Sequence, residues 1–399
     1  MNHFAVTRDM GGGTRHLELG RELVRRGWQV TVAASDFHLH QRRFRRRKSV
    51  RDRAPVEEIV DGVKFTWLWA APYEKNDFRR VLNWWSFSRS LLQWYSASPP
   101  PTVVIGSTPH LFAAFASLRL ARRFRIPFLL EVRDLWPESL AVSGRRPGPF
   151  YYALAALANH LYRNADRIIV LARGTAEYLV ARGVPSQRLR YIPNGVDVAA
   201  ARLARAPRSD RLRLVYAGAH GPANGLNVVL GAAEMLRSDA RITFELVGDG
   251  PAKNELQREA ARRSLKNVVF HEPMSKEAVA EFLADSDAGL MVLKDVPLFS
   301  FGVSPNKLFD YWAAALPVVC NVPGQLEAWV HESGGGVQTR DGSPAALADA
   351  VRTLAEQAPE KRAAMGSQAR EWVAQHHDRP ILAAELERAL DDALAESSR

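Results

Sequence analysis

Short apolar segments alternate with helical segments along most of this chain, and the alternation restricts the fold more than any other feature. In the first half, strands are expected over 28–33, 62–69, 103–105, 127–132, 167–171 and 189–192. The pattern restarts in the second half, with strands expected over 212–217, 243–247, 268–270, 288–293, 317–320 and near Val337. Strands separated by helices of about 10–15 residues form parallel sheets with right-handed crossovers. The sequence therefore predicts an α/β protein built from two doubly wound domains.

A boundary between these domains is expected near residues 193–197, where a polar stretch to Asp210 follows the last strand of the first half. At 399 residues the chain is too long for one ordinary core, which agrees with two domains. We predict a first domain over 1–195 and a second over 196–377. The helix expected over about 378–399 could pack back onto the first domain. Ligands of such sheets bind at the carboxyl ends of the strands, so the domains are expected to face each other across a cleft.

The chain carries a formal net charge of +11, which favours acidic partners. Residues 42–53 hold eight basic side chains within twelve positions. They fit either a solvated loop or a contact with an anionic surface. Nucleic acid is not expected as a partner, because no aromatic platform or known binding module accompanies these residues. A Trp-rich helix expected over 79–95 suits a membrane interface, although a core helix explains the same residues.

Cysteine usage and hydropathy bear on the cellular setting. The single cysteine, Cys320, excludes an internal disulfide and a cysteine-based metal site. No apolar run reaches the roughly 18 residues that a membrane span requires, and no signal peptide opens the chain. We therefore expect a cytoplasmic protein, which the basic segment could hold at the inner face of the membrane.

One segment late in the second half is the strongest single indication of a site. Ser304 followed by Pro305 predicts an N-cap and a first helical residue. The helix start would offer free amides and a positive dipole end to an anion. Lys307 lies in the first turn, and Asp310 falls on the same helix face three residues later. The alternative is a capped amphipathic helix with an exposed Lys307–Asp310 pair.

Three glycine-containing loops, at residues 9–14, 218–225 and 248–251, could admit a phosphate or a sugar to backbone amides. Only residues 2–6 precede the first loop, which is too few for a convincing strand. Either that strand is very short, or the true start of the protein lies upstream.

Several motifs occur in a fixed order: Gly11-Gly-Gly-Thr-Arg-His16, Ile192-Pro-Asn-Gly-Val-Asp197, Val247-Gly-Asp-Gly-Pro251, Ser304-Pro-Asn-Lys-Leu-Phe-Asp-Tyr311 and Met365-Gly366. In these motifs the chain resembles family 4 glycosyltransferases, which have the GT-B fold of two Rossmann-like domains. Glu131-Val-Arg-Asp-Leu-Trp-Pro-Glu138 adds a likeness to a bacterial surface-polysaccharide branch. That branch includes O-antigen and lipopolysaccharide transferases of N-acetylated amino sugars such as N-acetylfucosamine.

The resemblance implies a retaining transfer from a nucleotide sugar, with UDP the expected nucleotide, to a lipid-linked or polysaccharide acceptor. It implies neither a metal nor a further cofactor. Two other functions fit the same sequence: a nucleotide-sugar epimerase of this fold, and a nucleotide-sugar-binding protein that lacks catalysis. Asp285-Ser-Asp287 matches the Asp-x-Asp metal motif of another glycosyltransferase fold, but its place at the end of an expected helix favours capping.

The resemblance also implies roles for individual residues. The donor-binding residues would be Gly11, Gly12, Gly13, Arg15, Gly218, Asn224, Gly248, Asp249, Gly250, Phe270, Ser304, Pro305, Asn306 and Asp310. Lys307 would stabilise the leaving diphosphate, because no metal neutralises it. His110 and Arg133 would contact the acceptor. Asp134, or alternatively Glu138, is the candidate catalytic carboxylate.

Three positions depart from the family pattern. Relatives usually carry a pair of glutamates where this chain has Gly302 and Asp310. Relatives often place Arg and Lys in the loop that here contains Ala219 and Asn224. Arg133-Asp134 occupies a region where many relatives have a histidine. Because Ala219 and Asn224 replace the Arg and Lys of relatives, Lys307 is expected to make more of the contact with the phosphates, with help from Arg15.

Overall fold

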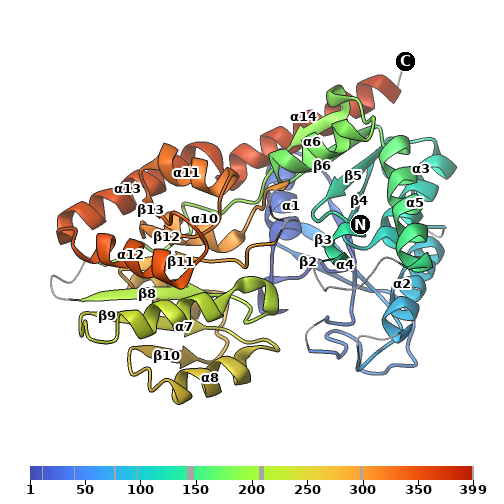
Figure 1. The fold of residues 1–399 in the computed structure, drawn as a ribbon. Helices are drawn as coiled ribbons and strands as arrows, with labels where there is room; N and C mark the ends of the chain where they lie inside the picture. Colours follow the sequence, from blue (N-terminus) through green and yellow to red (C-terminus); the bar gives the residue numbers. More distant parts are fainter. Residues whose placement is uncertain are drawn as a thin grey trace. The chain divides into compact units, whose positions relative to one another are not determined.

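The computed structural model describes residues 1–10, 12–39, 41–75, 78–96, 98–141, 148–205, 211–296, 299 and 301–397. The chain divides into two compact units, whose elements are labelled in Figure 1. The first unit comprises Met1–Pro193 together with Leu382–Arg399, and the second comprises Asn194–Ile381. Among the described residues, the first unit contains two sheets and the second contains one, and each unit has a buried core of its own.

Among the described residues, the strands of the first unit form a three-stranded and a four-stranded sheet. The three-stranded sheet has the order β1 (Thr31–Ser35), β3 (Val63–Leu68), β2 (Val56–Val60), with β1 parallel and β2 antiparallel to β3. The four-stranded sheet is parallel and has the order β4 (Val104–Ser107), β5 (Phe128–Val132), β6 (Arg167–Val170), β7 (Leu189–Tyr191).

Residues 1–3 connect these two sheets through backbone hydrogen bonds on both sides. Asn2 N donates to Ala33 O of β1 at 3.0 Å, and Ser35 N donates to His3 O at 3.1 Å. On the other side, Ser107 N of β4 donates to Met1 O at 3.1 Å. These residues therefore join the two sheets through backbone hydrogen bonds, although no strand is assigned to residues 1–6. Both alternatives for this segment stay predictions.

The hairpin of β2 and β3 differs from the expectation, which places no strand over residues 56–60. The turn consists of Asp61 and Gly62, both with positive φ (51° and 80°). An Asp-Gly pair between alternating apolar residues is a strong hairpin signal, because a tight turn of this kind needs two positive φ angles. That signal was present in the sequence.

The first unit contains these helices: α1 (Arg15–Arg25), α2 (Phe78–Ser96), α3 (Leu111–Phe124), α4 (Glu138–Ala141), α5 (Pro149–Asn164), α6 (Arg173–Ala181) and the larger part of α14 (Arg379–Ser397), with the 3-10 turns η1 (Arg8–Met10) and η2 (Ser186–Arg188). Leu382, Leu386 and Leu390 of α14 pack in one core with Leu129 of β5 and Ile169 of β6. The end of the chain is therefore part of the core of the first unit.

The second unit contains a parallel six-stranded sheet in the order β10-β9-β8-β11-β12-β13. Its strands are β8 (Leu212–Ala217), β9 (Ile242–Val247), β10 (Val268–His271), β11 (Ala288–Met291), β12 (Val318–Cys320) and β13 (Gly336–Gln338). Its helices are α7 (Leu226–Met235), α8 (Lys253–Arg262), α9 (Lys276–Ala284), α10 (Asn306–Ala313), α11 (Gln325–Ser333), α12 (Pro344–Ala355) and α13 (Pro359–His376), with the 3-10 turn η3 (Pro222–Asn224).

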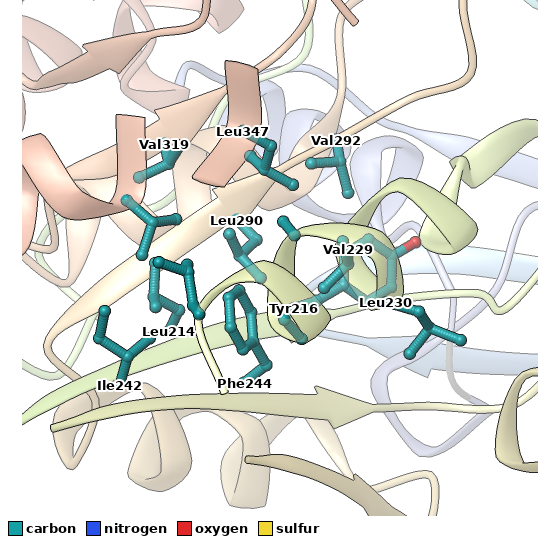
Figure 2. Packing of buried hydrophobic residues seen from close by; sticks show 14 of the residues in the cluster. Leu214, Tyr216, Val229, Leu230, Ile242, Phe244, Leu290, Val292, Val319 and Leu347 are labelled. Carbon is teal, nitrogen blue, oxygen red and sulfur yellow. The ribbon is translucent and has the colours of Figure 1, made fainter. Parts of the chain in front are cut away.

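Figure 2 shows the core on one face of this sheet. Leu214 and Phe244, on β8 and β9, pack with Leu290 of β11 and with Leu230 of α7 and Leu347 of α12. Alternate residues of a strand point to the same face, so Tyr216 lies on this face with Leu214, at the carboxyl end of β8. The predicted α/β class, with two domains built on parallel sheets, is confirmed.

Candidate functional site

The helix that was expected to begin at Pro305, with Ser304 as its N-cap, begins one residue later. α10 starts at Asn306, and Pro305 occupies the N-cap position in an extended conformation. The Ser304 side chain accepts a hydrogen bond from Asn194 N at 2.8 Å, and its carbonyl accepts one from Asn194 Nδ2 at 2.6 Å. The prediction of Ser304 as N-cap was therefore wrong, because a long-range partner uses its hydroxyl instead of the helix amides.

Lys307 lies in the first turn of α10 and is directed toward β8. Its Nζ is 2.9 Å from the Tyr216 hydroxyl and 3.4 Å from Asn224 Oδ1, and it lies 4.1 Å from the centroid of the Tyr216 ring. Burial lowers the pKa of Lys307 to about 7. The Tyr216 hydroxyl donates to Ala219 O at 2.8 Å, so it accepts from the lysine. This geometry does not match the alternative of an exposed Lys307–Asp310 pair.

The glycine loops after β8 and β9 pack backbone against backbone beside this lysine. Gly248 has φ of 138°, and a Cβ added there would lie 2.0 Å from Gly218 O. A Cβ at Gly218 would lie 3.5 Å from Lys307 Nζ. Only glycine fits this approach. The carboxyl ends of β8 and β9 thus present bare backbone and an ammonium group, which is the composition of a phosphate-binding site.

His220 lies in the same loop and was not predicted as a site residue. Its side chain is fully buried, and neither ring nitrogen has a hydrogen-bond partner. Its Nε2 lies 3.5 Å from the position of a Gly248 Cβ, and its ring centroid is 6.2 Å from that of Phe270. Burial lowers the pKa of His220, so the ring is neutral near pH 7. His220 stands inside the glycine-containing loop that follows β8, and this position in the sequence would have indicated it as a candidate site residue.

The other predicted donor residues of the second unit lie near this place with different exposures. Asp249 is exposed, and its carboxylate accepts a hydrogen bond from Gly250 N at 2.8 Å. Asn306 Oδ1 is buried without a hydrogen-bond partner at the start of α10. Asp310 is half-buried one turn after Asn306. The structure therefore brings Gly218, Asn224, Gly248 and Lys307 together, with Tyr216 and His220 as additional members.

In the first unit, Arg15 forms a buried network instead of an open anion site. It is 1% exposed, and its Nε donates to Glu131 Oε1 at 2.8 Å while its terminal nitrogens donate to the carbonyls of Ile192 and Pro193. Burial acts to raise the pKa of Glu131, but His16 and Arg15 lower it well below its ordinary value. This placement does not support the predicted contact of Arg15 with a diphosphate.

A cavity of about 190 Å³ opens beside this network. It is lined by His3, Phe4, Ala5, Val6, Met10, Gly12, Gly13, Ser35, Asp36, Phe37, His38, Leu39 and Arg133. Gly12 and Gly13, predicted for the donor, and Arg133, predicted for the acceptor, thus share one cavity. His3 Nδ1 and Arg133 Nε are buried there without a hydrogen-bond partner. Gly11, also predicted for the donor, lies outside the described residues.

Of the remaining predicted residues of the first unit, His110 and Glu138 form hydrogen bonds within the fold, and Asp134 is exposed to solvent. His110 is 1% exposed and caps α3, where its Nδ1 accepts from Ala113 N at 3.1 Å. Asp134 is exposed on the loop after β5. Glu138 accepts a hydrogen bond from the Tyr178 hydroxyl and lies 3.4 Å from Arg182. These contacts favour a packing role for His110 and Glu138 and leave Asp134 accessible.

Only some of the basic side chains of segment 42–53 are exposed to solvent. Arg47 is buried against Asp36 at 2.7 Å, and Arg46 pairs with Asp9 and Glu58. The exposed basic residues are Arg42, Arg43, Lys48, Arg51 and Arg53.

On α2, Trp84 is buried, but Phe78, Leu82 and Trp85 are 74%, 47% and 54% exposed. Their spacing places all three on one face of the helix.

Within the described part of the chain, no group of three or more His, Cys, Asp and Glu side chains could hold a metal ion. Asp287 accepts a hydrogen bond from Arg213 N at 2.8 Å, and Asp285 pairs with Arg205 at 2.8 Å. Among the same residues, no helix is both long enough and apolar enough to cross a bilayer.

Comparison with known proteins finds two glycosyltransferase domains along this chain. Residues 10–195 match a glycosyl transferase 4-like domain, and residues 211–357 match the domain of glycosyl transferases group 1. The Escherichia coli (strain K12) protein WcaI, whose name proposes glycosyl transfer in colanic acid biosynthesis, is 27% identical over 240 residues. That alignment covers 56% of this chain and 59% of WcaI. A D-inositol 3-phosphate glycosyltransferase of Kineococcus radiotolerans is 25% identical, with 91% of this chain and 86% of the relative covered.

Solved structures share the fold at low sequence identity. Sucrose-phosphate synthase from Thermosynechococcus elongatus has a TM-score of 0.76 at 17% identity, with 97% of this chain and 94% of that chain covered. Anabaena HepE, crystallised with UDP and glucose, has a TM-score of 0.69 at 15% identity, with 98% and 100% covered. The two domain matches and the fold together identify this chain as a glycosyltransferase of the GT-B type.

Proposed function

We propose that this glycosyltransferase moves an N-acetylated amino sugar from a UDP-sugar to a lipid-linked or polysaccharide acceptor in bacterial cell-surface glycan synthesis. The transfer retains the anomeric configuration and needs no metal. The position of Lys307 carries the proposal, since its ammonium group lies over the glycine loops with two neutral partners, Tyr216 and Asn224. A diphosphate leaving group placed there would receive both a positive charge and backbone amides.

The donor assignment rests on the residues gathered in the second unit. Gly218 and Gly248 let the diphosphate approach the backbone, and Asn306, at the start of α10, has a buried Oδ1 without a hydrogen-bond partner. Asp310 accepts from a hydroxyl of the ribose or the transferred sugar. Phe270, next to His220, flanks the base. HepE, whose structures hold UDP-glucose, supports UDP as the nucleotide.

The acceptor assignment rests on the 190 Å³ cavity of the first unit. This volume is below the usual 300–1,000 Å³ of drug-sized ligand sites, so it suits one sugar ring. Arg133 and His3 offer polar atoms without partners to its hydroxyl groups. The name of WcaI supports a surface polysaccharide as the acceptor class.

Retention follows if the leaving phosphate itself deprotonates the acceptor on the face from which it departs. A double displacement would require a carboxylate within bonding reach of the anomeric carbon. Asp134 is the accessible carboxylate of this region. We favour the mechanism in which the leaving phosphate deprotonates the acceptor. Several residues support a diphosphate site, whereas Asp134 alone is a candidate nucleophile.

A membrane-facing surface completes the proposal. Phe78, Leu82 and Trp85 form an exposed apolar stripe, and the Arg89 guanidinium lies 5.8 Å from the Trp85 ring. Arg42 lies 5.5 Å from the ring of Tyr73, a few residues before this helix. Apolar and basic residues side by side favour the anionic inner face of a membrane, where a lipid-linked acceptor is anchored.

Replacement of Lys307 by alanine tests the donor site. We expect Lys307→Ala to lower the rate of sugar transfer by at least about 100-fold, because one oxyanion-stabilising donor contributes that much. The exposed Lys266 supplies the matched control, Lys266→Ala, with an expected rate near that of the unmodified protein. Transfer from UDP-N-acetylamino sugars to a lipid-linked acceptor would be measured with and without EDTA.

The same assay separates the alternatives. Conversion of the UDP-sugar without acceptor would identify an epimerase, and binding without any transfer would identify a protein that lacks catalysis. A near-normal rate for Lys307→Ala would disprove the assignment of the lysine. Loss of transfer on addition of EDTA would contradict metal independence.

A further inference from the structure

A second and larger cavity, of about 410 Å³, lies in the first unit between α5, α6 and η2. It is lined by Asn159, Tyr162, Arg163, Arg182, Gly183, Val184, Pro185 and Arg188. None of these residues belongs to the candidate donor or acceptor site. The volume is within the usual range of small-molecule sites.

The cavity lies at the opposite edge of the four-stranded sheet from the candidate acceptor site. Arg133 follows the carboxyl end of β5, whereas Arg163 lies in the last turn of α5, the helix that leads into β6. Residues 182–188 likewise connect α6 to the start of β7. In a parallel sheet the starts of all strands lie at one edge and their carboxyl ends at the other. A ligand in this cavity would therefore not compete for the position of an acceptor.

The lining is basic and contains no carboxylate among its described residues. Arg188 donates to the Arg163 carbonyl at 3.3 Å, which fixes it across the end of α5. Arg182 lies 3.8 Å from the Tyr178 ring centroid, and its contact with Glu138 is long at 3.4 Å. Among the residues that the structure describes, no carboxylate forms an ion pair with the guanidinium group of Arg163 or Arg188, so their charge is available to a ligand.

Tyr162 gives the cavity a rigid wall. The residue is 4% exposed and comes from the last turns of α5, one position before Arg163. The ring is almost fully covered, so it shapes the wall of the cavity, while the arginines around it supply the charge that an anionic substituent of a sugar would need.

We propose that this cavity is a second ligand site, which binds the oxyanion of a sugar-sized ligand separately from the nucleotide-sugar site. Arginine forks bind phosphate and carboxylate oxygens in pairs of parallel hydrogen bonds, which gives this site its chemical selectivity. The oxyanion is either a phosphate on a sugar or the carboxylate of an acidic sugar.

Calorimetric titration of the full chain with inorganic phosphate, and separately with glucuronate, tests the proposal. We expect binding of at least one probe, with affinity reduced at least about tenfold in Arg163→Ser/Arg188→Ser. The exposed pair Arg237→Ser/Arg258→Ser removes the same charge elsewhere and should leave the affinity unchanged. Binding of phosphate alone would assign a phosphorylated ligand, and binding of glucuronate would assign an acidic sugar.

Three outcomes would overturn the proposal. They are no binding of either probe, an equal loss in both double variants, and a loss in Lys307→Ala instead of the cavity variant. The last would place the probe in the donor site. If the serine variant fails to fold, Arg163→Lys/Arg188→Lys keeps the charge but removes the forks, and the same loss of affinity is expected. The experiment measures binding of the probe and not sugar transfer. Its result can therefore be interpreted even if the proposed function is wrong.

Discussion

Lys307 illustrates how a single residue acquires its properties from the fold. Its first-turn position in α10 was readable from the sequence, but its partners were not. Tyr216 and Asn224 are 91 and 83 residues away along the chain. They hold the ammonium group without a carboxylate, which keeps it available for a diphosphate. The burial that comes with this position lowers the pKa of Lys307 to about 7.

This pKa predicts a pH dependence of donor binding. Above about pH 7 the free lysine is mainly neutral, whereas a bound diphosphate favours its protonated form and raises the pKa. Binding therefore takes up a proton, and the affinity for a UDP-sugar should fall by up to about tenfold per pH unit above pH 7. Calorimetry between pH 7 and 8.5, in buffers of different ionisation enthalpy, measures both the affinity and the proton uptake.

Lys307→Arg provides the control for this experiment. The guanidinium stays charged over the whole range, so the pH dependence should disappear even if the affinity is lower. An affinity of the unmodified protein that is constant from pH 7 to 8.5 would contradict the titration of Lys307.

At the scale of elements, α2 shows how one helix serves two environments. Trp84 and Phe87 are buried in the first unit, while Phe78, Leu82 and Trp85 are exposed. The buried face fits the explanation as a core helix, and the membrane interface stays a prediction for the exposed face. The basic segment is divided in the same way. Arg46 and Arg47 stabilise the fold through ion pairs, and neutralising them would test folding instead of membrane binding.

The exposed face of α2 predicts the result of a liposome sedimentation experiment. Phe78→Ser/Leu82→Ser/Trp85→Ser should reduce binding to vesicles with anionic lipids at least about tenfold, because apolar area and basic charge both contribute to interfacial binding. Neutralisation of Arg42, Arg43, Arg51 and Arg53 should reduce it at low salt and have less effect at high salt. Arg237→Ser/Arg258→Ser is the matched control. Equal binding of all variants would remove the membrane role.

At the scale of the whole molecule, the first unit is completed by residues from the end of the chain. Leu386 and Leu390 of α14 lie in its core, and Arg167 of β6 forms two hydrogen bonds with Glu396. Trp28 Nε1 also donates to Glu387 at 2.9 Å. The stability of this unit therefore depends on a helix that follows the whole second unit in the sequence.

Leu390→Ala should destabilise the first unit selectively. Leu390 is 2% exposed, and such a truncation lowers the free energy of unfolding by about 2–5 kcal/mol. Hydrogen exchange in urea, resolved for each unit, measures the effect. The exposed Arg388→Ala on the same helix should change little. A loss of protection confined to residues 194–381 would contradict the assignment of α14.

The sequence by itself determined the α/β class and the positions of most strands, and it predicts an anion site in the segment around Lys307. These features depend on the local alternation of apolar residues and on the residues that begin a helix. Both are set by residues that are neighbours in the sequence. β2 was missed although the Asp61-Gly62 turn indicated it. The tertiary structure decided which of the candidate polar residues stay accessible. Ser304 bonds to Asn194 instead of capping α10, and Arg15 is buried against Glu131. These partners lie more than 100 residues away in the chain, so burial and pairing arise only when the fold brings distant segments together.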